Sequence, residues 1–347
     1  MNRLTPQHTS AVACPANDPA PVFEYFRAGF ASNLLIAAVA HFRLFEKLEG
    51  RSLTHAELAA ALGLEDRPAV VLLTALRAMG LIIADTSGRL SLSTPGAEQL
   101  TPGSYFSIAD YLGLAADTPA VLELVERLRA NRTGTAFVYK ETVESPMEEE
   151  ASARNLTLAL AGRAKNVAPV LADRLPLGNG TLLDIGGGTG IYSIALLQKN
   201  PGLRAIILDR PEVLRVAAEF ATQYGVADRL ELRPGDMFTA AFPPADSVLF
   251  SNVLHDWDVD DCRGLVRRAA DCLRPGGSIL IHDVLLNDAL DGPLAVACYS
   301  AQLFTMAEGR AYSAAEYTAW LREAGLQVQP PIPTLAHCHV IRGGSGR

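Results

Sequence analysis

Two polar residues in the second half of the chain, His255 and Asp283, have the chemistry to remove a proton from a hydroxyl group. His255 lies just past an apolar segment, Ser247–Phe250, and Asp283 ends a later one, Ser278–Asp283. A histidine with an unperturbed pKa of about 6.5 can take a phenolic or enolic proton at neutral pH. Such a base needs a partner that orients its other ring nitrogen, and the Asp283 carboxylate suits that role. By position alone, His255 fits a helix-capping or packing role equally well.

A glycine-rich stretch upstream has the form of a ligand-binding loop. The apolar segment Leu182–Ile185 leads directly into Gly186-Gly187-Gly188-Thr189-Gly190, and a helix is expected over Ile191–Gln198. Glycines permit positive φ angles and let a ligand approach the backbone, while the helix N-terminus supplies N–H groups that have no helical partners. A tight strand-to-helix turn without a ligand is the alternative for the loop alone.

Together with this loop, Asp209 and Asp236 predict a nucleoside-binding site. Asp209 ends the next predicted strand, nineteen residues after Gly190, where a carboxylate can accept both ribose hydroxyls of an adenosine. Asp236 follows the third strand, where it can accept from the adenine amino group while Met237 packs on the ring. Because Ile191 follows the loop, the spacing is G-x-G-x-G and not the G-x-G-x-x-G of dinucleotide sites. S-adenosylmethionine is therefore the predicted cofactor.

The elements that must hold these residues alternate between strand and helix from residue 181 onward. This alternation predicts an α/β fold with a Rossmann-like, mostly parallel, doubly wound sheet, in which ligands bind at the carboxyl ends of the strands. The predicted strands are Thr181–Ile185, Arg204–Asp209, Leu230–Leu232, Ser247–Phe250, Ser278–Asp283, Leu326–Val328 and Cys338–Ile341.

The segment before this sheet predicts a helical winged-helix domain. Thr54 and Glu57 have the spacing of a capping box at the start of a helix that ends at Gly63, and a second helix is expected over 67–79. Apolar segments at 81–83 and 89–92 flank a turn and predict a hairpin. Such a module suggests DNA binding, but few basic residues lie between positions 52 and 100, which favours a packing or dimerisation module. These basic residues are Arg67, Arg77 and Arg89.

Domain boundaries follow from changes in composition and periodicity. Residues 1–20 predict a flexible tail, 21–104 the winged-helix dimerisation domain, 105–176 a helical linker or substrate lid, and 177–343 the catalytic domain. Residues 22–48 keep a helical period and are apolar on almost every side. This helix is therefore expected to be buried, either within the chain or in a partner subunit.

Composition limits the partners and the compartment. The 347 residues are 49% hydrophobic and 20% charged, enough for a large core, and the formal net charge of −8 argues against nucleic acid. The five scattered cysteines indicate a reducing compartment. Residues 28–42 are too few to span a bilayer and no signal peptide is apparent, so a cytoplasmic protein without a membrane partner is expected. His337 and His339 share a strand face but have no third ligand nearby, so no metal is expected.

Five motifs together resemble the plant-type small-molecule O-methyltransferases and their bacterial relatives in natural-product tailoring. The motifs are Leu183–Gly190, Leu208–Pro211, Gly235–Phe238, Asn252–Trp257 and Leu273–Gly277. The likeness covers nearly the whole chain, because that family also has an N-terminal winged-helix dimerisation domain. It implies a homodimer that uses S-adenosylmethionine, with His255 as the general base and Asp283, where the family usually has Glu, as its orienting acid.

The resemblance also implies contacts for the cofactor and for a small-molecule hydroxyl substrate. The implied cofactor contacts are Asp184, Gly186, Gly188, Gly190, Asp209, Asp236, Met237, Phe238 and Ser251, of which Ser251 stands where many plant members carry Lys. The implied substrate contacts are Cys298, Gln302 and Met306.

One position departs from the family pattern. Ala311 stands where a second family acid is expected; either Asp283 suffices alone, or Glu308 or Tyr312 substitutes, or the chemistry has changed. The leading hypothesis is an O-methyltransferase acting on an aromatic or polyketide-like hydroxyl. The second is an enzyme of the same scaffold that keeps S-adenosylmethionine but catalyses hydroxylation, decarboxylation or a pericyclic step. The third is a winged-helix regulator that senses S-adenosylmethionine.

Overall fold

The computed structural model describes residues 9–131 and 149–345, which form two compact units. The first, called the sheet unit, is formed by residues 9–21, 149–285 and 314–345. The second, called the helical unit, is formed by residues 22–131 and 286–313. Each unit is described by itself.

The sheet unit is built on strands in the order β10-β11-β7-β6-β3-β4-β5, with β9 paired to the end of β11. The neighbours from β7 to β5 are parallel, and β11 runs antiparallel to β7 and β10. This is the predicted doubly wound arrangement with an antiparallel edge. The strands are β3 (Gly180–Ile185), β4 (Leu203–Asp209), β5 (Leu230–Pro234), β6 (Ala245–Ser251), β7 (Leu273–Leu286), β9 (Gln327–Val328), β10 (Ile332–Pro333) and β11 (Cys338–Gly344).

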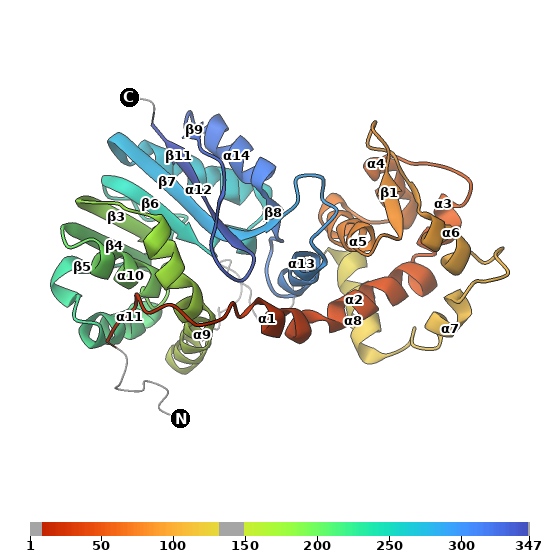
Figure 1. Ribbon diagram of the computed structural model, residues 1–347, viewed down its shortest axis with the longest axis horizontal. Helices are drawn as coiled ribbons and strands as arrows, with labels where there is room; N and C mark the ends of the chain where they lie inside the picture. Colours follow the sequence, from red (N-terminus) through yellow and green to blue (C-terminus); the bar gives the residue numbers. More distant parts are fainter. Residues whose placement is uncertain (1–8, 132–148, 346–347) are drawn as a thin grey trace. The chain divides into compact units, whose positions relative to one another are not determined.

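Helices flank this sheet on both faces (Figure 1). They cover the central strands, so the last four residues of β3 are all buried, as expected of a parallel strand between two helical layers. The helices α9, α10 and α11 pack together, and α12 packs on α14. Their bounds are α9 (Glu150–Arg174), α10 (Ile191–Lys199), α11 (Pro211–Gln223), α12 (Val259–Asp271) and α14 (Ala314–Glu323), with short 3-10 turns at η3 (Ala227–Arg229) and η4 (Leu254–Asp256).

The helical unit contains the predicted helix–turn–helix and hairpin. Thr54 and Glu57 form the predicted capping box: the Glu57 N–H donates to Thr54 Oγ1 at 3.2 Å, and the Thr54 N–H donates to Glu57 Oε2 at 2.8 Å. Gly63, with φ of 68°, ends the first helix. The elements in question are α4 (His55–Leu62), α5 (Asp66–Ala78) and the antiparallel strands β1 (Ile82–Ala84) and β2 (Leu90–Leu92).

The first predicted helix, over 22–48, is interrupted in the structure. The Phe42 N–H bonds the Ala37 carbonyl in a π-type turn, and Arg43 takes the left-handed conformation with φ of 49°. Burial is also uneven, because Leu34 is fully buried whereas Phe26 is 72% exposed. The segments are α1 (Ala20–Arg27), α2 (Gly29–Ile36), η1 (Ala37–His41) and α3 (Leu44–Leu48).

By length and apolar composition alone, the helical stretch Ala20–His41 is able to cross a membrane. The stretch is longer than the 15 residues at 28–42 considered from the sequence, because the helix begins earlier. Core helices of water-soluble proteins and signal sequences share these features, so the stretch is weak evidence for a membrane span.

Two further predictions differ from the structure. Residues 105–108 and 114–118 are not helical, so the predicted helical region 105–176 starts later than expected and is divided, and its residues 132–148 lie outside the described part of the chain. Residues 286–313, predicted within the catalytic domain, group with the helical unit. The reason is α13 (Leu294–Met306), a helix without charges that packs on α5 and α2. The other elements are α6 (Thr94–Leu100), α7 (Ala109–Gly113), α8 (Pro119–Ala130) and β8 (Tyr312–Ser313).

Candidate active site

The glycine loop joins the carboxyl end of β3 to the start of α10, as predicted. Gly186, Gly188 and Gly190 all have positive φ, of 67°, 59° and 72°. A Cβ at Gly190 would lie 2.4 Å from the Cδ1 atom of Ile207 in β4, whereas a Cβ at Gly188 would meet no atom of the described residues within 4 Å. The loop therefore packs closely on the sheet at Gly190 and borders open space at Gly188.

Gly190→Ala is expected to lower the free energy of unfolding by about 2–4 kcal/mol, because the side chain adds left-handed strain and a clash with Ile207. Gly188→Ala is the matched control, since it adds the strain alone, about 1–2 kcal/mol. Urea unfolding of both variants measures the difference. Equal losses for the two would contradict the close packing of Ile207 on the loop.

The Asp184 carboxyl faces inward, toward α10. It is 1% exposed, and its Oδ2 accepts from the Ser193 hydroxyl at 2.7 Å, while its Oδ1 is buried and has no hydrogen-bond partner among residues 9–131 and 149–345. Burial raises the pKa of Asp184 to about 7, the charge of Asp209 adds to this rise, and the Ser193 hydrogen bond opposes it. The structure thus places Asp184 as a support of the loop.

This burial predicts a pH-dependent stability that depends on Asp184. The unfolded carboxyl ionises at about pH 4, so from there to about pH 7 the folded state binds more protons and loses stability as pH rises. Asp184→Asn removes this ionisation. Urea unfolding without cofactor measures the free energy of unfolding of both proteins. The difference between the variant and the wild type should grow in favour of the variant by up to about 4 kcal/mol from pH 4 to pH 8. If the free energy of unfolding changes with pH in the same way in both proteins, Asp184 does not have this role.

Asp209 lies beside the loop at the end of β4. Its Oδ2 accepts from the Gly188 N–H at 2.8 Å and its Oδ1 from the Arg210 N–H at 2.7 Å. Burial raises the pKa of Asp209 above its usual value, although both backbone hydrogen bonds oppose the rise. A carboxylate has about four lone-pair positions, so each oxygen keeps capacity to accept a further hydroxyl.

Asp236, Met237 and Phe238 form the turn after β5. Asp236 Oδ1 accepts from the Phe238 N–H at 2.8 Å, and Arg268 of α12 binds the carbonyls of both Met237 and Phe238. The Phe238 ring packs edge-on against Trp257, with centroids 4.6 Å apart. The turn is therefore anchored from two sides.

Ser251 is engaged with a histidine that the sequence analysis did not single out. Its Oγ lies 2.8 Å from Nδ1 of the fully buried His282, whose Nε2 lies 3.1 Å from the Thr334 hydroxyl oxygen. Because Thr334 donates its proton to the Cys338 carbonyl, His282 must donate from Nε2, and Ser251 must donate to Nδ1. Burial and the Arg163 charge lower the pKa of His282 to about 3, which keeps it neutral. The Ser251 oxygen can therefore only accept, and it already accepts from the Asn252 amide at 3.3 Å.

Arg163 of α9 is a second residue missed at the sequence level. Its guanidinium donates to Asn252 Oδ1 and to Cys338 Sγ, and the Asn252 amide donates to the hydroxyl of Tyr192 at 3.2 Å. Asn252 has φ of 56°, a conformation that asparagine adopts more readily than most residues. Arg163 thereby brings a positive charge to the carboxyl end of β6, next to the segment that carries His255.

His255 and Asp283 meet, as predicted. His255 lies in η4 after β6, and its Nδ1 is 2.6 Å from Asp283 Oδ1 in β7; the two residues are 3% and 1% exposed. Asp283 Oδ1 also accepts from the Val284 N–H at 2.8 Å, and Oδ2 accepts from the Tyr317 hydroxyl of α14 at 3.0 Å. Tyr317 was not among the predicted site residues.

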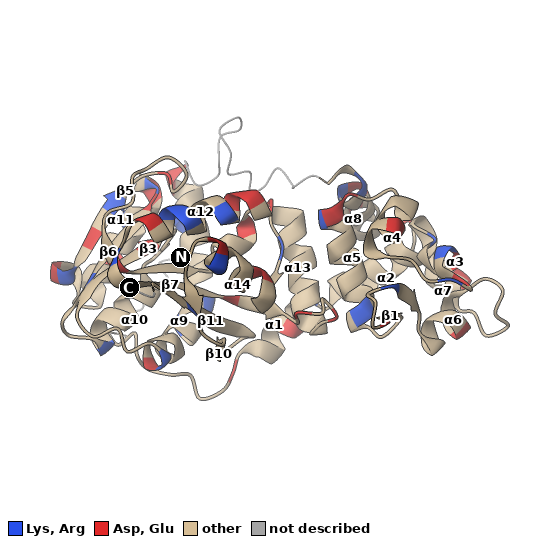
Figure 2. Cartoon of the chain, turned by 90° about the horizontal axis from the view of Figure 1, so that it is seen from above, with Lys and Arg blue, Asp and Glu red and all other residues tan. Residues whose placement is uncertain are grey.

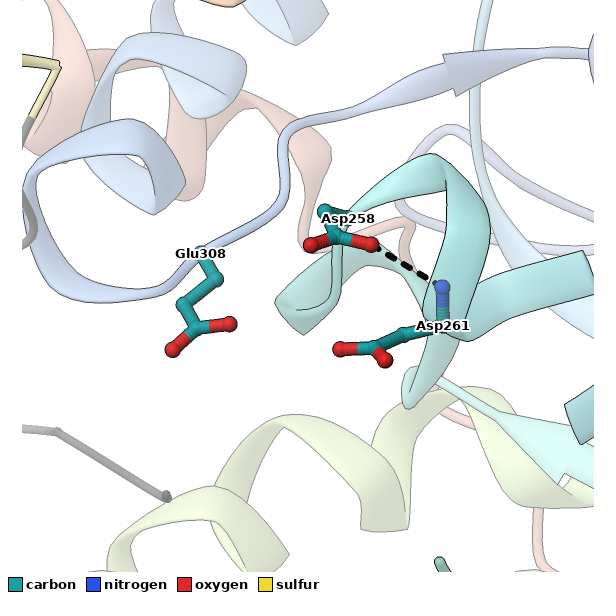
Figure 3. Close-up of side chains that lie close together, drawn as sticks. All are labelled: Asp258, Asp261 and Glu308. Atoms are coloured by element: carbon teal, nitrogen blue, oxygen red, sulfur yellow. Dashed lines mark hydrogen bonds between the residues drawn. The ribbon is translucent and has the colours of Figure 1, made fainter. Parts of the chain in front are cut away.

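The segment after His255 is fixed by a helix cap. Asp258 accepts from the Asp261 N–H at 2.9 Å and so starts α12 (Figure 3). The figure also draws Glu308, which belongs to the helical unit. The capping residue follows Asp256 by two positions, and the Asp256 carboxylate lies 3.6 Å from His255 Nε2.

The electrostatics of this group favour a charged histidine. Burial disfavours the imidazolium, but the charges of Asp283 and Asp256 outweigh it and raise the pKa of His255 above its usual value. Burial likewise opposes ionisation of Asp283, yet His255, the Val284 N–H and Arg163 hold the pKa of Asp283 below its usual range. Burial raises the pKa of Asp256 to about 6. The pair is thus suited to accept a proton on His255 while Asp283 stays ionised.

The predicted substrate contacts lie on α13 in the helical unit. Cys298 is 3% exposed, and Gln302 and Met306 are half-buried. Gln302 Oε1 accepts from Arg27 Nε at 3.0 Å, and the Arg27 guanidinium stacks 3.8 Å from the centroid of the Tyr299 ring. Arg27, from a different part of the sequence, is another residue that the sequence analysis missed.

The segment with the departure from the family pattern is also in the helical unit. Ala311 is fully buried, and its N–H donates to the Ser300 hydroxyl at 3.2 Å. Arg310 lies over the Tyr312 ring, 4.5 Å from its centroid. Ala311 has no side-chain oxygen, whereas the Tyr317 hydroxyl donates a hydrogen bond to Asp283.

The loop and Asp209 fit the adenosine part of S-adenosylmethionine. Asp209 has acceptor capacity left for ribose hydroxyls, and the space beside Gly188 is open. Gly186, Gly188, Gly190 and Asp209 are the residues that would hold the nucleoside.

Comparisons with known proteins identify the family of the chain. The O-methyltransferase domain model matches residues 149–327. The chain is 33% identical to 3-hydroxy-5-methyl-1-naphthoate 3-O-methyltransferase of Streptomyces sahachiroi, over 81% of this chain and 82% of the relative. It is 32% identical to L-tyrosine C(3)-methyltransferase of Streptomyces lavendulae, over 83% and 81%. An O-methyltransferase family 2 protein from Planctomyces limnophilus, solved with apigenin, superposes with a TM-score of 0.89, at 46% identity over 97% and 98%.

The chain belongs to the O-methyltransferase family. It is an S-adenosylmethionine-dependent O-methyltransferase of the natural-product type.

Proposed function

We propose that this enzyme methylates a hydroxyl of an aromatic or polyketide-like small molecule, with His255 as the general base oriented by Asp283. The observation that carries the proposal is the buried 2.6 Å contact between His255 Nδ1 and Asp283 Oδ1. In this arrangement Asp283 orients the ring through Nδ1, and Nε2 is the nitrogen that takes the proton.

When bound, S-adenosylmethionine supplies a methyl group that its sulfonium charge makes electrophilic. His255 donates its Nδ1–H to Asp283, which leaves the lone pair on Nε2 to take the proton of the acceptor hydroxyl. The imidazolium that forms is stabilised by Asp283 on one side and by Asp256, 3.6 Å from Nε2, on the other. Asp209 and the glycine loop hold the nucleoside, and Asp236, Met237 and Phe238 form the wall beside the adenine.

Support for an aromatic acceptor comes from two relatives. The Streptomyces sahachiroi relative is a naphthoate O-methyltransferase, and the Planctomyces limnophilus structure contains apigenin. We assign Cys298, Gln302 and Met306 to the acceptor side, with Arg27 fixing the Gln302 amide. Ser251, whose hydroxyl proton goes to His282, is assigned to accept from the cofactor.

We further propose a homodimer formed by the helical unit, without nucleic-acid, membrane or metal partners, in the cytoplasm. Apolar side chains exposed on this unit support a second copy as the partner: Val22, Tyr25, Phe26, Tyr105, Phe106, Tyr111 and Leu114. Its basic residues between positions 52 and 100 are engaged within the unit, since Arg67 and Arg77 donate to backbone carbonyls and Arg89 to Ser52 and Glu57. Helices α2 and α13 carry no charges (Figure 2).

An assay with methyl-labelled S-adenosylmethionine and a panel of acceptors tests the proposal. The panel should contain hydroxynaphthoates, flavones including apigenin, and hydroxylated polyketides. We expect label on a hydroxyl oxygen of at least one acceptor, and its loss in His255→Ala. Cofactor binding without transfer to any acceptor would favour the non-methylating alternative, to which Ala311 points. Tight binding of duplex DNA at physiological salt would favour the regulator.

A further inference from the structure

The carboxylate of Asp283 is held at both of its oxygens. Oδ1 faces His255 and accepts from the Val284 N–H, while Oδ2 accepts from the hydroxyl of Tyr317 at 3.0 Å. Asp283 is 1% exposed and Tyr317 is 0% exposed, so the contact is shielded from bulk solvent. A carboxylate with donors at both oxygens cannot rotate without losing one of them.

The Tyr317 hydroxyl is itself held in place by its helix. Tyr317 lies in the first turns of α14, and its ring packs edge-on against Trp320 of the same helix, with centroids 5.2 Å apart at 87°. A buried tyrosine side chain fixed by ring packing has little freedom to move its hydroxyl. The position of α14 on the sheet thus sets the position of the donor, because α14 packs on β11, the neighbour of β7.

We propose that Tyr317 is a positioning residue of the active site: its hydroxyl fixes the Asp283 carboxylate in the orientation that orders the His255 ring for proton transfer. This inference rests on the proposed role of His255 as the base. It also names a group that was not considered from the sequence, where Glu308 and Tyr312 were the candidates to substitute for the acid missing at Ala311.

A positioning role has an electrostatic consequence. When His255 is neutral, the pair carries one negative charge, on Asp283, and a hydrogen bond to that charge favours this state. Without the Tyr317 hydroxyl, the buried carboxylate is less well stabilised, so His255 holds its proton more tightly. The other titratable or charged groups that act on the pair are Asp256 of η4, Arg163 of α9, Cys262 of α12, Tyr192 of α10 and His282 of β7.

The test is a direct titration of His255 in Tyr317→Phe, which keeps the ring and removes the hydroxyl. In full-length protein labelled with ¹³C at histidine Cε1, the His255 signal is identified by its absence in His255→Ala. We expect the pKa of His255 to rise by about half a unit to one unit in Tyr317→Phe. The matched control is Tyr224→Phe, which removes the hydroxyl of a buried tyrosine that packs on Phe220. A pKa change no larger than in this control overturns the proposal.

A second substitution applies if Tyr317→Phe does not fold. Incorporating 3-fluorotyrosine at position 317 keeps the ring and the hydroxyl but makes the hydroxyl a stronger donor. The pKa of His255 should then move in the opposite direction, below that of the wild type. A shift upward, or none, contradicts the proposal.

Kinetics separate this proposal from the proposed function. With an acceptor found in the panel, Tyr317→Phe should lower kcat about 10-fold in the wild-type background and leave it unchanged in Asp283→Asn, because the hydroxyl acts through Asp283. If the double variant instead loses kcat by the product of the two single losses, Tyr317 has a merely structural role. If Asp283→Asn and His255→Ala retain full activity, it is the proposed function that fails.

Discussion

Replacing His255 with alanine is expected to lower kcat by about 10²- to 10⁴-fold, the range that a positioned general base contributes. The affinity for S-adenosylmethionine should not change, because none of the residues assigned to hold the nucleoside contacts His255 among the interactions described. Steady-state kinetics together with calorimetric cofactor binding measures both quantities.

The pH dependence of the methylation rate also tests the role of His255. The base must be neutral to act, and its pKa lies above the ordinary value, so the wild-type rate should rise with pH through neutrality and level off above it. His255→Ala should lack this rise. His55→Ala, which removes a histidine of the helical unit, is the control and should keep the wild-type rate and profile. A wild-type-like profile in His255→Ala would mean that another group removes the proton.

Replacing Asp209 with alanine should weaken binding of S-adenosylhomocysteine about 100-fold, because hydrogen bonds to a charged acceptor contribute about 1.5–3 kcal/mol each. The loss includes the support that Asp209 gives to the Gly188 N–H. Isothermal titration calorimetry of the wild type and the variant measures the affinity.

The 2′-deoxy analogue of S-adenosylhomocysteine isolates the ribose contribution. It should bind the wild type more weakly than the parent compound does, and it should bind Asp209→Ala with the same affinity as the parent. If both proteins prefer the parent compound over the 2′-deoxy analogue to the same extent, the ribose does not bind Asp209. That result would contradict the assigned cofactor orientation.

Local sequence patterns were sufficient for the elements that carry their own signals. The Thr54 and Glu57 capping box involves residues three apart, and the glycine loop between β3 and α10 is set by adjacent residues. The parallel strands were predictable because burial on both faces requires continuous apolar segments. The break of the first helix at Arg43 was not, since no Pro or Gly marks the point where the backbone changes.

The residues that complete the site depend on contacts between distant segments. Tyr317 lies 34 residues from Asp283, and Arg163 lies 89 residues from Asn252, so no spacing rule connects them. Ser251 has a likewise distant partner, His282, which turns its hydroxyl proton away from a ligand. The departure at Ala311 was visible in the sequence, but the hydroxyl that contacts Asp283 in the structure could be found only from the fold.

The most direct test of the account is the position of the transferred methyl group. The wild type and His255→Ala are each incubated with S-adenosylmethionine labelled with ¹³C at the methyl group and with a phenolic acceptor from the panel, and the products are examined by NMR. We expect the label on the phenolic oxygen with the wild type and almost none with His255→Ala. Label on a carbon atom of the acceptor, or undiminished O-methylation by His255→Ala, would contradict hydroxyl methylation driven by His255.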